Sequence, residues 1–324
     1  MKEQPMVTVI VPAYNSAITI ACCLESVCAQ NYPKERFTVV VVDHASSDGT
    51  GAIARSYADR VHPKIGGTIS AVRNLGALQA DGEIYAFVDS DCIVDPDWLA
   101  AAVEVLRDPS VGATGSGYLT PETFTWVEKA WLYELKRAPF KTGFLPGGNL
   151  IVRGEVFKAI GGFDESLITG EDADICSRIN RSGHPVINDC RIRCVHLGNA
   201  KTLKVFFRKE RWYGANMIEG LSVKDYDATF VATLVFCAGN VSTLLGLLLY
   251  LYSGDPRLFG LSVSAVFLVL AASSLHRVMR SRKYSYFPHL VVLYFVYFWA
   301  RTCAMVKALT QNSAKLQKAA DPAR

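Results

Sequence analysis

Three short apolar runs in the first part of the chain each end at a proline or an aspartate. They are residues 7–11, 37–42 and 84–88, followed by Pro12, Asp43 and Asp89. Each run is rich in β-branched or aromatic residues and bounded by turn residues, which is typical of a buried strand. The positions where these strands end are therefore the first places to look for polar side chains that share one edge of a sheet.

Helical patterns alternate with these runs. They cover residues 18–30, 48–57, 68–80, 96–107, 153–160 and 171–181, and short strands are expected at 186–187 and 192–195. In the helix at 96–107, Asp95 is the expected N-cap and Pro96 stands in the first turn. Alternating strands and helices predict an α/β fold with a largely parallel sheet that carries helices on both faces.

The acidic turn Asp89-Ser90-Asp91 is the strongest candidate for a functional site. Two carboxylates two residues apart at a strand end can reach one divalent cation. Other acidic groups stand at similar strand or loop ends, namely Asp43, Asp48 and Glu171-Asp172. In open α/β sheets ligands collect outside the carboxyl ends of the strands, so these groups are expected to meet.

The chain becomes strongly apolar in its last third. Residues 228–252 and 258–275 carry no charge, and residues 287–306 carry only His289 and Arg301. About 20 apolar residues suffice to cross a bilayer, so two to three transmembrane helices are expected between residues 228 and 309. Residues 276–283 are basic and are expected to form a cytoplasmic loop, which places the N-terminal domain on the same side. Whether the third segment crosses, or is tilted or re-entrant, stays open, because the tail at 310–324 is also basic.

Residues 201–227 connect the two parts. Basic residues alternate there with aromatic ones, which is typical of an amphipathic helix lying on a membrane, although an ordinary packed helix fits equally well.

The net charge of +4 is too small to indicate nucleic-acid binding, and no nucleic-acid motif is present. The nine cysteines lack the spacing of a disulfide framework and fit a reducing cytosol. Cys190, Cys194 and His196 resemble half of a zinc site, but no second ligand pair follows. No secretory signal opens the sequence.

Six motifs together resemble the inverting family 2 glycosyltransferases of the GT-A fold. They occur in order over about residues 6–215, at 9–15, 42–50, 71–76, 89–91, 161–165 and 171–174. The resemblance implies a GT-A domain over residues 1–200, a nucleotide-sugar donor and a Mg²⁺ or Mn²⁺ cofactor. The family usually has two consecutive acids where this chain has Asp43-His44. Asp43 matches the first acid, so recognition of the base is expected, whereas the role of the second acid is left open.

The resemblance also implies a donor site. The residues that match it are Pro12, Ala13, Tyr14, Asn15, Asp43, Arg73, Asp89, Ser90 and Asp91. Asp43 would accept the N3–H of uracil, and Arg73 would pair with the diphosphate as a planar fork. Asp91 would be the direct metal ligand and Asp89 would lie nearer the ribose. His196 is either a further metal ligand or a structural histidine.

Asp172 is the expected general base. Inversion needs one carboxylate that takes the proton of the acceptor hydroxyl, and Glu171 would raise the pKa of its neighbour through like charge. The plainer alternative is that these acids only complement the helix dipole, and Asp174 fits that alternative better. Gly148 and Asn149 are expected to shape the acceptor pocket, since glycine allows close approach.

Arg208 to Trp212 resembles the Gln-x-x-Arg-Trp motif of processive synthases, with Arg208 in place of Gln. That likeness implies that Arg211 holds the pyrophosphate and Trp212 stacks on the acceptor sugar. The prediction is a multi-pass enzyme of the cytoplasmic or inner membrane, with its catalytic domain in the cytoplasm. It would transfer one sugar from a UDP-sugar to a lipid-linked or polyprenyl-linked acceptor. A small processive synthase and a non-catalytic nucleotide-sugar-binding scaffold are the alternatives, and a homo-oligomer stays open.

Overall fold

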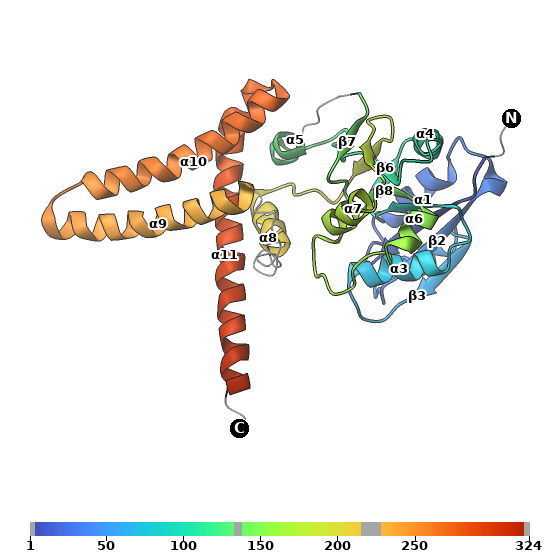
Figure 1. Cartoon of the computed structure of the whole chain (residues 1–324), viewed down its shortest axis with the longest axis horizontal. Helices are drawn as coiled ribbons and strands as arrows, with labels where there is room; N and C mark the ends of the chain where they lie inside the picture. Colours follow the sequence, from blue (N-terminus) through green and yellow to red (C-terminus); the bar gives the residue numbers. More distant parts are fainter. Residues whose placement is uncertain (1–3, 133–137, 215–227, 321–324) are drawn as a thin grey trace. The chain divides into compact units, whose positions relative to one another are not determined.

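The computed structural model describes residues 4–132, 138–214 and 228–320, which form two compact units (Figure 1). The first unit comprises residues 1–123 and 132–199, and the second comprises residues 124–131 and 200–324. The second unit therefore contains a short stretch, 124–131, that the sequence places inside the first.

The first unit is built from ten strands and six α-helices among its described residues. In chain order they are β1 Val7–Ala13, α1 Ile20–Cys28, β2 Phe37–Asp43, α2 Thr50–Ala54, β3 Arg60–Pro63, α3 Ile69–Leu78, β4 Ile84–Val88, β5 Cys92–Val94, α4 Trp98–Val105, β6 Ala113–Gly115, β7 Phe140–Thr142, β8 Asn149–Arg153, α6 Gly154–Ala159, α7 Glu171–Arg181, β9 Val186–Asn188 and β10 Cys194–His196.

Eight of these strands form one sheet, in the order β3-β2-β1-β4-β8-β6-β9-β7. β1, β2, β3 and β4 run parallel, and β8 then pairs antiparallel with both β4 and β6. β5 and β10 form a separate two-stranded antiparallel sheet. The predicted α/β fold with a mostly parallel sheet is confirmed.

Alternate residues of the central strands feed two cores, one on each face of the sheet. Val9 and Val41 pack on one face with α1 and α4. Ile10 and Phe87 pack on the opposite face with α3, α6 and α7. Because every residue of β1 is buried, that strand reads as a continuous apolar run in the sequence.

Several details differ from the sequence prediction. α2 is shorter than the helix expected at 48–57. α4 begins after Asp97 rather than after Asp95. Asp95 lies in the turn before the helix, where its backbone carbonyl accepts the N–H of Trp98. β3, β5, β6, β7 and β8 were not predicted.

The second unit is helical. Its elements are α5 Trp126–Leu132, α8 Leu203–Tyr213, α9 Ala228–Ser253, α10 Arg257–Ser281 and α11 Phe287–Ala320. Three stretches are long and apolar enough to cross a membrane, namely Thr229–Ser253, Arg257–Ser281 and Tyr284–Thr310. The loop expected at 276–283 is wrong for most of its length, because α10 continues through Arg277 and Arg280.

The amphipathic helix expected after residue 201 is present as α8, with Phe206 and Glu210 on its buried face. The part of that prediction at 215–227 lies outside the described residues. α11 runs on to Ala320, so most of the expected polar tail is helical.

Candidate active site

The acidic turn that follows β4 lies beside the small two-stranded sheet. The register of β5 and β10 places His196 opposite Cys92. His196 therefore lies beside Asp91, with its Nε2 3.3 Å from Asp91 Oδ1. Its other ring nitrogen, Nδ1, lies 2.8 Å from Oδ1 of Asn199. The ring of Tyr118 stacks on His196 with the centroids 4.5 Å apart.

Arg73, on α3, joins the acidic turn to the first residue of α7. Its Nη2 donates to Asp89 Oδ1 and its Nη1 donates to Glu171 Oε1, both over 2.8 Å. Burial alone would lower the pKa of this guanidinium, but the two carboxylates outweigh burial and raise it. Arg73 therefore stays charged, and its rigid fork fixes the separation of the two acids.

Asp172 follows Glu171 at the start of α7. The pKa of Asp172 is raised to about 6, chiefly by burial and next by Glu171, while Arg73 acts in the opposite direction. Its Oδ1 accepts the N–H of Ala173 over 2.9 Å. A carboxylate with this pKa is still largely ionised at neutral pH and is basic enough to accept a proton.

Two consecutive glycines let the backbone approach this charged cluster. A Cβ at Gly147 would lie 2.8 Å from Nη1 of Arg73. A Cβ at Gly148 would lie 2.5 Å from the hydroxyl of Tyr118 and would collide with the carboxylate of Asp89. The N–H of Gly148 donates to the Tyr118 hydroxyl over 3.2 Å. Any side chain at either position would push these groups apart.

Asp91, Cys92 and His196 are the one group of potential metal ligands found in the described part of the chain, with their ligand atoms within 4.8 Å of one another. Cys92 is fully buried, and burial raises the pKa of its thiol well above the usual value. Mg²⁺ and Mn²⁺ prefer hard ligands such as carboxylate oxygens to a thiolate, so Asp91 and His196 are the usable pair. A Cβ at Gly198 would collide with Asp91 Oδ2, so glycine lets the backbone lie close to that carboxylate. One carboxylate and one imidazole fit a divalent cation that takes its other ligands from phosphate and water.

Hydroxyl groups tie together the loops that follow β1, β2 and β4. The N–H of Ser16 donates to Thr50 Oγ1 over 2.7 Å, and Ser16 Oγ lies 2.8 Å from Ser90 Oγ. The N–H of Asn15 donates to Ser46 Oγ over 2.9 Å. These contacts hold the three strand ends together, and Asn15 and Ser90 are the expected donor-site residues that take part in them.

Pro12 and Ala13 are buried at the end of β1, whereas Tyr14 is 63% exposed. The ring of Tyr14 lies 5.8 Å from the ring of His44. Asp43 Oδ1 accepts the N–H of Ser46 over 3.1 Å, and no hydrogen bond to its Oδ2 is found among the described residues. The Oδ2 atom of Asp43 is therefore available to accept a hydrogen bond from a ligand.

Asn149 corrects one sequence prediction. Its side chain is fully buried, where its Oδ1 accepts from Trp98 Nε1 over 2.7 Å and its Nδ2 donates to the carbonyl oxygens of Ser116 and Ile192. It fixes the start of β8 and presents no group to an acceptor pocket.

Arg211 and Trp212 are exposed residues of α8, in the second unit. The Arg211 guanidinium lies 6.0 Å from the ring centre of Phe207, and the ring of Trp212 lies 5.1 Å from that of Tyr213. Their expected contacts with pyrophosphate and acceptor sugar stay predictions.

Tyr118 and Ser16 were not found from the sequence. Tyr118 lies in an irregular stretch and reaches the site because Leu119 bridges Val195 of β10. A pairing between residues so far apart leaves no periodic signal in the sequence.

Two family models match the chain. The model "Glycosyl transferase family 2" matches residues 8–161, and the model "Glycosyl transferase family group 2" matches residues 86–301, which is more than half of the chain. The chain belongs to the family 2 glycosyltransferases.

Individual relatives agree with this assignment. Glycosyltransferase AglE of Haloferax volcanii is 33% identical over 192 residues, covering 56% of this chain and 63% of the relative. The "Probable glycosyltransferase YdaM" of Bacillus subtilis is 26% identical over 213 residues, covering 57% of this chain and 49% of the relative. The chain thus spans less than two thirds of the length of these relatives.

A solved structure with the same fold is that of mannosyltransferase PcManGT from Pyrobaculum calidifontis in complex with GDP-Man and Mn²⁺. The TM-score is 0.62 at 23% sequence identity, over 95% of this chain and 88% of the other. This likeness confirms the GT-A fold.

Proposed function

We propose that the protein is a membrane-anchored, inverting glycosyltransferase. It moves one sugar from a UDP-sugar to a hydroxyl group of a lipid-linked or polyprenyl-linked acceptor at the cytoplasmic membrane face, in surface polysaccharide or glycolipid synthesis. The observation that carries this proposal is the buried fork of Arg73, which binds Asp89 on one side and Glu171, the neighbour of Asp172, on the other. A displacement reaction needs such a fixed relation between the donor site and the base.

Asp91 and His196 would hold the Mg²⁺ or Mn²⁺ ion. The ion would supply positive charge that stabilises the departing diphosphate. The Mn²⁺ in the structure of the Pyrobaculum enzyme, which shares the fold, supports a divalent ion in this family of sites. Asn199 would help to position His196, because its contact with His196 Nδ1 orients the ring so that Nε2 faces Asp91.

The donor would lie across the loops after β1, β2 and β4. Asp43 would accept the uracil N3–H through its available Oδ2, and Tyr14 would cover the base. Asn15 would shape the same pocket through its contact with Ser46, and Ser90 would do so through its contact with Ser16. Asp89 would lie near the ribose.

Arg73 takes a different role from the one expected. Both arms of its guanidinium bind carboxylates, and its side chain is only 4% exposed. We assign Arg73 to positioning of the two acidic groups instead of direct contact with the diphosphate.

Asp172 would act as the base. Its carboxylate takes the proton of the acceptor hydroxyl, whose oxygen bonds to the anomeric carbon while the bond between that carbon and the UDP oxygen breaks. The bonding electrons leave with UDP, and the new glycosidic bond has the opposite anomeric configuration. Gly148 would let the acceptor approach the cluster closely.

The membrane helices favour a lipid-linked acceptor, since they would keep the enzyme beside headgroups. Arg301, the residue expected to line a polar path in a processive synthase, instead pairs with Glu210 over 2.9 Å. This pairing favours a single transfer over polymer extrusion.

The experiment that tests the proposal measures release of nucleoside diphosphate by the detergent-purified full chain. A panel of UDP-sugars and GDP-sugars is offered with total membrane lipid, either with Mn²⁺ or with EDTA. We expect release from a UDP-sugar that requires both metal and lipid. Binding of UDP without release from any donor would favour the non-catalytic scaffold.

A further inference from the structure

α11 has two opposite faces of different character. Its exposed large apolar side chains recur at helical spacing and share one face: Val292, Phe295, Trp299, Val306 and Leu309. On the opposite side lie the residues that contact α5 and α8: Tyr294, Tyr297, Arg301 and Ala304. One face of α11 is therefore free for lipid while the other is covered by protein.

The covering helices contact the middle of α11. Trp131 of α5 packs against Tyr294 and Tyr297, with ring centroids 5.6 and 5.7 Å apart. Further along, Glu210 of α8 pairs with Arg301. The candidate span runs over Tyr284–Thr310, so these contacts lie in its central part.

α8 is too highly charged to lie in the hydrocarbon core. Its exposed side includes Lys204, Arg208 and Arg211, for which the described residues provide no acidic partner. If α11 crossed the bilayer, α8 would be held near the depth of Arg301, well inside the core. Each cation there would cost about 2.5–3.5 kcal/mol or more.

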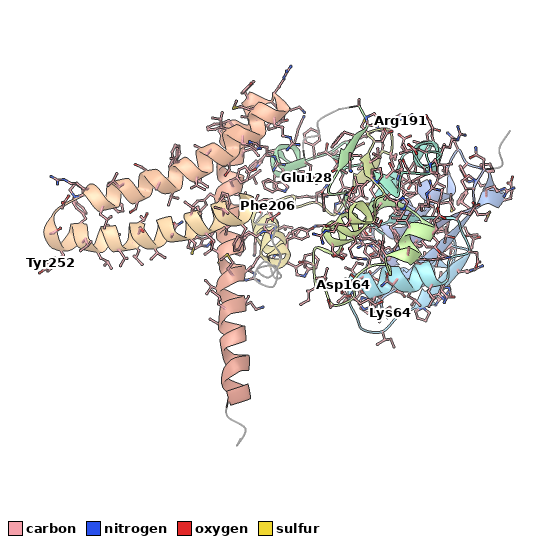
Figure 2. The ribbon with its side chains drawn as sticks, viewed as in Figure 1. Lys64, Glu128, Asp164, Arg191, Phe206 and Tyr252 are labelled. Carbon is pink, nitrogen blue, oxygen red and sulfur yellow. The ribbon has the colours of Figure 1, made fainter. Side chains whose placement is uncertain are left out.

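α9 and α10 differ from α11 in both surface and direction. They pack side by side as a hairpin, and α11 crosses this hairpin steeply near its base, the end opposite the turn at Gly254 (Figure 1). The rings of Phe295 and Phe298 contact Phe236 there, at 5.9 and 5.5 Å. Tyr252 marks the remote tip of the hairpin (Figure 2) and is 92% exposed.

The hairpin away from α11 exposes apolar side chains in nearly continuous succession, which fits full immersion in lipid. They include Val241, Leu244, Leu245, Leu247, Leu248, Leu249, Leu251, Leu258, Leu261, Val263, Phe267 and Leu268. A helix that is apolar all round is a spanning helix, whereas one with a single apolar stripe lies at a surface.

We propose that α9 and α10 cross the membrane as a hairpin and that α11 lies in the membrane interface along its length, with its apolar stripe in the lipid and α5 and α8 on its watery side. The end of α11 then lies on the same membrane side as the start of α9. This inference rests on the membrane anchoring in the proposed function and adds the number of crossings. It also leaves the basic residues that follow Thr310 on the side that basic segments prefer.

Site-directed labelling in intact cells tests the topology. A full chain with the exposed Cys22 and Cys190 changed to serine receives one new cysteine, Asp255→Cys in the hairpin turn or Thr310→Cys near the end of the apolar stripe. A membrane-impermeant maleimide should label the first in intact cells and the second only after lysis. Labelling of both in intact cells would show that α11 crosses. Labelling of neither would overturn the spanning hairpin, and with it the anchor, while leaving the catalytic proposal intact. The same chain without an added cysteine gives the background.

Depth measurement by spin labelling tests the orientation of α11 directly. Labels at Val292→Cys and Val306→Cys should report nearly the same depth in vesicles of anionic and zwitterionic phospholipid. A spanning α11 would separate them by about 20 Å, because an α-helix rises 1.5 Å per residue. Labels at Leu244→Cys and Leu251→Cys of α9 are the matched control and should differ by about 10 Å.

Discussion

Asp172 owes its raised pKa first to burial and then to Glu171. As the proposed base, Asp172 accepts a proton only when it is ionised, so sugar transfer should fall as the pH drops below about 6, roughly tenfold for each pH unit. Glu171→Gln removes one cause that raises the pKa of Asp172, so the acid limb of the pH–rate profile should move to lower pH. Initial rates measured over about two pH units on either side of that pKa test this prediction.

Asp174→Asn is the matched control for that profile. Asp174 lies on the same helix but pairs with Arg178 over 2.6 Å, away from the base. Its acid limb should not move. If the acid limb of the pH–rate profile does not move in Glu171→Gln, or moves equally in both variants, Glu171 does not raise the pKa of Asp172.

Gly148 and Gly143 form a second matched pair. A methyl group at Gly148 would collide with Asp89 and crowd the Tyr118 hydroxyl, whereas nothing lies within 4 Å of a Cβ at Gly143. Gly148→Ala should therefore lower the free energy of unfolding by about 1–3 kcal/mol and weaken donor binding. Gly143→Ala should leave both nearly unchanged. Thermal unfolding and UDP binding by calorimetry measure the two effects, and equal behaviour of the variants would contradict the close approach seen at Gly148.

At the scale of elements, Arg73 joins α3, the end of β4 and the start of α7. Arg73→Met would leave Asp89 and Glu171 without their cation, and breaking a buried ion pair typically costs about 3–5 kcal/mol. Arg60→Met is the control, because Arg60 pairs with Asp81 at an exposed position, where ion pairs contribute at most about 1 kcal/mol. Chemical denaturation of both variants should show a large loss for the first alone. Similar small losses would mean that the Arg73 fork does not hold these elements together.

The elements that could be predicted from the sequence are those with a strong local pattern. β1, β2 and β4 are continuous apolar runs, and α7 combines apolar spacing with acidic residues at its start. β5, β6 and β7 have three residues each, too few for any periodicity, and are strands because of partners far along the chain. The pairing of β5 with β10 is what places His196 beside Asp91.

The candidate site shows the same limit. Asp89, Asp91, Asp172 and His196 could be singled out because they stand at the ends of recognisable elements. The role of Arg73 could not, because residue type alone does not reveal that both of its partners are carboxylates. The prediction for Asn149 was wrong for the converse reason. Asn149 follows two glycines that suggest a pocket, yet the hydrogen bonds of its side-chain amide are made inside the core.

At the scale of the whole molecule, a family 2 glycosyltransferase domain is joined to a helical unit with three stretches long enough to span a membrane. By length and composition alone, all three stretches are candidate membrane spans. The structure separates them, because α11 is the one apolar helix of the described residues that has charged helices, α5 and α8, packed against its middle. We therefore expect two crossings and an interfacial third helix.

The role of Asp172 is best tested by comparing Asp172→Asn with Asp174→Asn for transfer and for UDP binding, using the full chain, its metal and its lipid acceptor. We expect Asp172→Asn to lower the transfer rate by about 10²–10⁴-fold and to keep the affinity for UDP, since a general base acts only in the chemical step. Asp174→Asn should retain both. If Asp172→Asn transfers sugar at a normal rate, or loses UDP binding together with transfer, Asp172 is not the base of this enzyme.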